Sequence, residues 1–169
     1  MNKADADELW AFAELIYDAP ARRDIFLTLQ DRFGLDVNLL IFCIWTGLTG
    51  RGARPREDIS AAMAALAPWQ GAVILPLRSA RRALKAHSSE PAYAEIKEKI
   101  LSAELAAEKV AQMLLLEGGL KSAALSTQNG EAAMRANLAL YCKLKGIGNN
   151  DEVNALIARL CETAMEQRR

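Results

Sequence analysis

The spacing of apolar residues predicts helices along almost the whole chain. Apolar residues recur at the i, i+3, i+4, i+7 spacing near the start, at Leu9, Phe12, Ala13 and Ile16. That spacing predicts an amphipathic helix over about residues 5–18. Pro20 suits the first turn of a helix and Gly34 suits a C-terminal cap, so a second helix is expected between them. No window alternates apolar and polar residues for long enough to predict a strand.

The most apolar segment comes next. Asp36 is expected to cap a helix by accepting from its free backbone amides. Residues 39–45 (LLIFCIW) have no polar face, which is typical of a central, buried helix. Gly47, Gly50 and Gly52 are expected to break this helix and open a cationic loop.

The second half of the pattern predicts further helices. They are expected over about 57–66, 69–86, 91–117, around Met134 to Cys142, and over 151–167. Pro68 is expected to open the 69–86 helix, and Pro76 to kink or split it. We therefore predict an all-α fold, an irregular bundle of about seven helices. Since 169 residues suit one sizeable core, we expect a single domain over 1–169.

Composition gives expectations about the partners and the cellular location of this bundle. Lys plus Arg and Asp plus Glu both number 21, so net charge gives no general attraction to nucleic acid or membranes. The three cysteines are odd in number and widely spaced, which indicates reduced thiols. The acidic start differs from a secretory signal, so we expect a cytoplasmic protein. The longest strongly apolar run, Leu39 to Trp45, is too short to span a bilayer, so no membrane association is expected.

No pattern in the chain indicates a reaction. One histidine and no C-x-x-C pair leave a metal site without ligands, and no cofactor motif is present. The glycines at 47, 50 and 52 lack the Gly-Lys-Ser/Thr ending of a phosphate-binding loop. His87 has no evident catalytic partner. The sequence names no catalytic residue and favours a non-enzymatic protein over an enzyme.

Three segments together resemble a known family. They are Trp10-x-Phe12 with Tyr17, LQDRFGLDVNLLIFCIW at 29–45, and Trp69 with LPLRSARRALK at 75–85. The pattern is similar to that of a family of short proteobacterial proteins of unknown function. The likeness covers residues 8–86, and residues 90–169 are the more variable half. It implies a bacterial, cytosolic origin, and it implies no activity, cofactor or catalytic residue.

A dense group of polar residues lies beside the most apolar helix, at Gln30, Asp31, Arg32, Asp36 and Asn38. One interpretation is structural: Asp36 caps the helix and Asp31 pairs with an arginine. The other is a ligand pocket that uses Asp31, Asp36 and Asn38, with Trp10 or Trp45 as an apolar wall. The sequence leaves both open.

A basic stripe is the second candidate site. Arg78, Arg81, Arg82 and Lys85 share one side of a helix. With Arg51, Arg54 and Arg56, residues 51–90 hold seven cations against three acids, a local charge of +4. Like charges on adjacent turns repel, so we expect these cations to pair with acidic groups. The acidic groups are either residues of the chain, such as Asp31 and Asp36, or those of an external partner.

Three functional hypotheses follow. The first is protein binding: a helical interaction domain docks an acidic protein or structured RNA through Arg78, Arg81, Arg82 and Lys85, with Arg51 and Arg54. The second is a small-molecule-binding bundle with a pocket near Asp31–Asn38 and Trp45. The third is a structural homodimer formed through helix 91–117 or helix 151–167.

Overall fold

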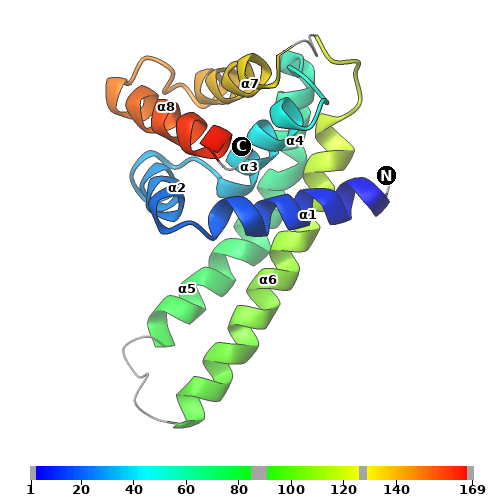
Figure 1. Cartoon of the computed structure of the whole chain (residues 1–169). Helices are drawn as coiled ribbons and strands as arrows, with labels where there is room; N and C mark the ends of the chain where they lie inside the picture. Colours follow the sequence, from blue (N-terminus) through cyan, green and yellow to red (C-terminus); the bar gives the residue numbers. More distant parts are fainter. Residues whose placement is uncertain (1–2, 85–90, 126–128, 167–169) are drawn as a thin grey trace.

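The computed structural model describes residues 3–84, 91–125 and 129–166. The described residues form an all-α bundle without strands, as predicted, with seven helices when α4, η1 and α5 are counted as one (Figure 1). The elements are α1 (Lys3–Tyr17), α2 (Pro20–Phe33), α3 (Val37–Leu48), α4 (Arg56–Trp69), the π-helical segment η1 (Gln70–Ile74), α5 (Leu75–Leu84), α6 (Pro91–Gly119), α7 (Gly130–Leu144) and α8 (Asp151–Glu166).

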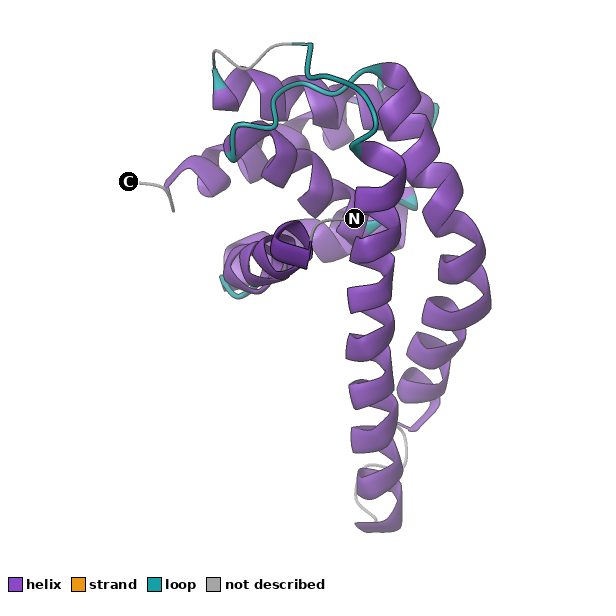
Figure 2. Ribbon diagram, turned by 90° about the vertical axis from the view of Figure 1, so that its right-hand side faces the viewer, coloured by secondary structure: helices purple, strands orange, loops and turns teal. Residues whose placement is uncertain are grey.

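The molecule has a body and an arm. α5 and the first half of α6 lie side by side and extend well beyond the other helices (Figures 1 and 2). α1 packs against α6 where the arm leaves the body. No residue of α5 is buried, whereas α6 continues into the body and packs along α4. The junction of arm and body is therefore a corner of the fold, where α1 and α5 both pack against α6.

α3 is the centre of the body. All of its residues are buried, as its continuous apolar run predicts, and Asp36 caps it through the Leu39 amide at 3.1 Å. Gly47 lies inside α3 and does not end it, which corrects the expected break. A Cβ at Gly47 would lie 2.3 Å from the backbone nitrogen of Met134, so glycine lets α7 approach. The turn begins after Leu48, and Gly50 and Gly52 supply its positive φ angles of 84° and 73°.

The helix that follows runs from Arg56 to Leu84 without a break. The expectation that Pro68 opens a helix is wrong, and of the two outcomes expected at Pro76, a kink or a split, the split is wrong. Pro68 lies inside α4, and a π-helical turn follows, in which the Leu75 amide donates to the Gln70 carbonyl. A π turn is wider than an α turn and is one way for a helix to continue where a proline removes an N–H donor.

This long helix bears on the expectation of no membrane span. By length and composition alone it is apolar enough to cross a membrane, because its charges lie near its ends. Such a helix is weak evidence, since helices of soluble proteins pass the same test. The absence of a membrane span stays a prediction. The length of the longest unbroken apolar run was too narrow a criterion, because it did not detect this helix.

Candidate functional site

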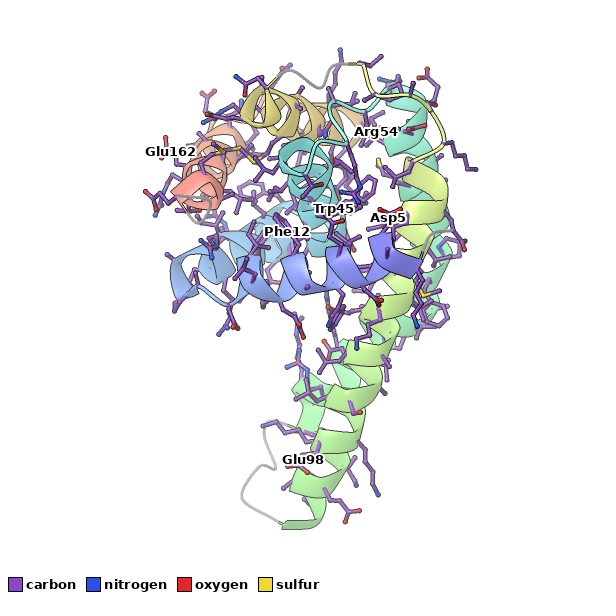
Figure 3. All side chains as sticks on the ribbon, turned by 45° about the vertical axis from the view of Figure 1, so that its right-hand side comes forward. Asp5, Phe12, Trp45, Arg54, Glu98 and Glu162 are labelled. Carbon is purple, nitrogen blue, oxygen red and sulfur yellow. The ribbon has the colours of Figure 1, made fainter. Side chains whose placement is uncertain are left out.

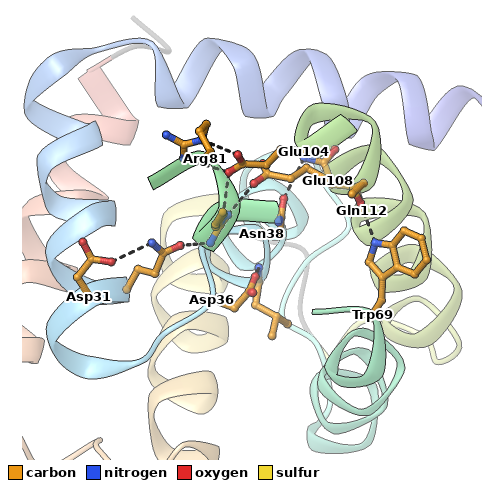
Figure 4. A network of polar contacts seen from close by, with 12 residues as sticks. Asp31, Asp36, Asn38, Trp69, Arg81, Glu104, Glu108 and Gln112 are labelled. Atoms are coloured by element: carbon orange, nitrogen blue, oxygen red, sulfur yellow. Dashed lines mark hydrogen bonds and ion pairs between the residues drawn. The ribbon is translucent and has the colours of Figure 1, made fainter. Parts of the chain in front are cut away.

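The basic stripe meets acids of its own chain at the junction. Arg78 donates to Glu108 at 2.6 Å, lies 3.3 Å from a Glu104 oxygen, and also donates to Gln30 (Figure 4). Arg81 binds the same Glu104 carboxylate through Nε at 2.6 Å and Nη2 at 3.2 Å. The two arginines and two glutamates join α5 to α6, and Gln30 joins them to α2.

The outer part of the stripe is more open. An Arg82 nitrogen lies 3.6 Å from an Asp31 carboxylate oxygen, and both side chains are more than half exposed. An exposed ion pair of this kind contributes little stability. Lys85 lies outside the described residues. Arg82 is therefore the described member of the stripe that is most accessible from solvent.

The two loop arginines also face inward. Arg54 is 5% exposed, and it forms a salt bridge to Asp58 and donates to the Ser122 carbonyl. Arg51 pairs with Asp5 and Glu8 and lies over the Trp45 ring, 3.8 Å from its centroid. Both arginines are part of the packing of the body, whose side chains Figure 3 shows.

The polar residues that the sequence places near α3 lie on two different sides of that helix. Asp36 caps α3, and its own backbone amide donates to the Tyr141 hydroxyl at 2.8 Å. Burial raises the pKa of the Asp36 carboxyl group, although the Leu39 amide and Arg78 oppose the shift. Asn38 is buried on another side, where it accepts weakly from Gln112 at 3.5 Å.

Two pockets open at the junction, and Arg78 lines both of them. The larger, of about 510 Å³, is called the Asp36 pocket. Its apolar walls include Leu35, Leu39 and Leu66. Its polar lining includes Asp31, Asp36, Gln70, Arg82, Tyr141 and Lys145. Helices from three parts of the chain, α2–α3, α4–α5 and α7, therefore build this pocket together.

The smaller pocket, of about 380 Å³, is called the Trp10 pocket. It lies between α1, α2, α3, α5 and α6. Trp10 and Tyr17 of α1 line it, and so do Leu101 and Leu105 of α6. Asn38 and Gln112, both buried, belong to its lining as well.

The structure thus separates the predicted pocket residues. Asp31 and Asp36 line the Asp36 pocket, whereas Trp10 and Asn38 line the Trp10 pocket. Trp45 lines neither of these pockets. It is fully buried in the core, and its indole N–H donates to Glu8 at 3.2 Å. Trp45 is unsuitable as a pocket wall because Arg51 and α1 cover it.

Comparison with known proteins gives one family. A family model described as a protein of unknown function (DUF2390) matches residues 8–115. The chain belongs to this family. The match extends past residue 86, where the sequence pattern suggested a limit, and takes in most of α6 with Glu104 and Glu108. No curated protein and no solved structure matches the chain.

Sequence reasoning missed several residues of the junction in this family member. Glu104 and Glu108 were read only as part of an amphipathic helix, yet their i, i+4 spacing puts both on the side that faces α5. Gln70, Gln112 and Tyr141 gave no signal, because single polar residues in apolar helices do not reveal what they face. Within residues 3–84, 91–125 and 129–166, no group of three His, Cys, Asp or Glu side chains is placed to hold a metal ion.

Proposed function

We propose that this protein binds a small molecule in the Asp36 pocket. The observation that carries the proposal is that Asp36, Tyr141 and Arg78 line one pocket together with apolar residues. Pockets that combine an apolar surface with a few convergent polar groups of shifted pKa are typical binding sites. Burial raises the pKa of Tyr141 as well as that of Asp36.

The lining gives this pocket both apolar and polar contacts for a ligand. Leu35, Leu39 and Leu66 offer an apolar surface. The Tyr141 hydroxyl oxygen accepts from the Asp36 backbone amide, which leaves the hydroxyl hydrogen to be donated to a ligand. The α3 amide of Leu39 is already taken by Asp36, so the helix N-terminus itself is not the anchor. A ligand would instead contact the side chains of Asp36 and Tyr141.

The test is a fragment screen against the isotope-labelled full chain, read by two-dimensional NMR. Compounds that shift the backbone signals of Leu39 and Tyr141 should lose binding in Ala67→Trp, which places an indole at the pocket wall. Ala64→Trp is the matched control, because Ala64 is also exposed on α4 and does not line the pocket. Failure of every compound to shift these signals would contradict the proposal, as would equal binding to both variants.

The docking hypothesis stays a prediction, but the observation that suggested it, a set of unpaired cations, no longer supports it. It required cations without partners in the chain, and Arg51, Arg54, Arg78 and Arg81 all pair with acids of the chain. Arg82 pairs weakly with Asp31. Homodimer formation through α6 or α8 also stays a prediction, and sizing by light scattering tests it.

A further inference from the structure

The Trp10 pocket has apolar walls that the chain leaves uncovered. Leu101 and Leu105 are 43% and 47% exposed, and both lie on the side of α6 that lines this pocket. Trp10 and Tyr17, from α1, add partly exposed aromatic surface. Large apolar side chains exposed together in a hollow mark binding sites more often than scattered ones do.

The buried part of this lining carries hydrogen-bonding groups without partners. Asn38 and Gln112 are each 3% exposed, and the single bond between their amides is long, at 3.5 Å. The Asn38 Nδ2 donor and the Gln112 Oε1 acceptor have no hydrogen-bond partner among the described residues. A buried amide atom without a hydrogen-bond partner lowers the stability of the fold. An unpaired donor and an unpaired acceptor in the same pocket are therefore candidates for contacts with a ligand.

The charges around the pocket cancel. Its lining includes three cations, Arg78, Arg81 and Arg82, and three acids, Glu14, Glu104 and Glu108. Arg78 and Arg81 are bound to Glu104 and Glu108, so neither sign is free to hold an ionic ligand in the interior. The pocket therefore favours a neutral molecule over a carboxylate or an amine.

We infer that the Trp10 pocket is a separate binding site for a neutral, planar molecule that carries a carboxamide or lactam group. The C=O of such a group accepts from Asn38 Nδ2 and its N–H donates to Gln112 Oε1, which satisfies both orphaned atoms. The ring occupies the apolar space between Trp10 on one side and Leu101 and Leu105 on the other. The two pockets share Gln30, Arg78 and Arg82 in their linings, but Trp10, Asn38 and Gln112 line only the Trp10 pocket, so either proposal can fail without the other.

Benzamide, benzoate and benzylamine form a matched set of probes, which share a ring and differ in charge. In an NMR titration of the full chain, benzamide should shift the indole N–H signal of Trp10 and the side-chain amide signals of Asn38 and Gln112. For so small a molecule we expect a dissociation constant on the order of 1 mM. Benzoate and benzylamine should bind at least about tenfold more weakly, since each leaves a buried amide atom unpaired.

Two variants test the contacts. Asn38→Leu with Gln112→Met removes both amides while keeping their approximate shape, so the fold should be kept or stabilised while benzamide binding is lost. Leu101→Trp obstructs the pocket from an exposed position, and Ser102→Trp, next to it and outside the lining, should bind as the wild type does. The inference is overturned by equal binding of the three probes, by the absence of benzamide binding, or by binding that survives in the amide-free double variant or in Leu101→Trp.

Discussion

Three arginines, Arg22, Arg54 and Arg78, turn their guanidinium groups into the molecule and join distant parts of the chain. Arg22 donates to the carbonyls of Ile16 and Thr163, in the last turns of α1 and α8. A cation at these two C-terminal ends also suits the helix dipoles. In the sequence these residues look like surface cations, because an arginine reveals nothing about partners dozens of residues away. The caps at Asp36 and Gly34 were predictable, since a cap is decided by its immediate neighbours.

The partly buried carboxyl group of Asp36 should make stability depend on pH. Asp36→Asn keeps an acceptor for the α3 cap and removes the charge. Because burial raises the folded-state pKa of Asp36, ionising this carboxyl group is less favourable in the folded protein than in the unfolded chain. The wild type should therefore lose stability relative to Asp36→Asn as pH rises from ~3.9, the ordinary aspartate value, through the raised pKa.

Urea unfolding of both proteins between pH 3 and pH 7 measures this difference. Below the ordinary aspartate pKa the carboxyl group is neutral in both states, so the difference between the two free energies of unfolding should be constant there. A wild type that gains on the variant as pH rises would show that the Asp36 charge is stabilised in the fold.

At the scale of elements, amphipathic spacing and caps predicted where most helices lie. The exceptions are at glycine and proline residues, where the outcome depends on contacts with distant parts of the chain as well as on the local sequence. Gly47 reads as a helix breaker, and its actual role depends on α7, which comes about ninety residues later. Pro76 suggested a kink or a split, yet the helix continues through the π turn before it toward the junction with α6. The residue type at Gly47 or Pro76 does not by itself show whether the helix ends there or continues.

Two glycines of the same chain give opposite predictions. Gly47→Ala should destabilise the fold by roughly 1–3 kcal/mol, because its Cβ would overlap the Met134 backbone and push α3 and α7 apart. Gly71→Ala should be neutral or stabilising by up to about 1 kcal/mol, since a Cβ there meets nothing within 4 Å and the helix loses less entropy on folding. The midpoints of urea unfolding measure both changes. Similar losses in the two variants would mean that α3 and α7 are not in close contact.

At the scale of the whole molecule, the two helices of the arm are held together by polar contacts more than by a core. α5 has no buried residue, and the cluster of Arg78, Arg81, Glu104 and Glu108 holds it against α6. An all-α fold was predictable from periodicity, but the corner between arm and body was not, because it depends on which helices pair. The two candidate pockets lie at that corner, so they could be located only from the structure.

Charge reversal separates the two ends of the stripe. Arg78→Glu would place a third carboxylate beside Glu104 and Glu108, so the fold should lose about 3 kcal/mol or more and α5 should open. Arg82→Glu should cost less than about 1 kcal/mol, because Arg82 and Asp31 are both well exposed. Hydrogen exchange across residues 75–84 should be faster than in the wild type only in Arg78→Glu. Equal exchange in the two variants would mean that the cluster does not hold the arm.

The long helix from Arg56 to Leu84 also matters during synthesis. Its middle, from Ile59 to Leu77, carries no charged residue, so it leaves the ribosome as an apolar segment that is prone to aggregate until it packs. Its main packing partner, α6, is the next element, and translation from Leu84 to Gly119 takes only about 2–7 s. The order of these two helices therefore shortens the time in which the nascent chain is open to aggregation.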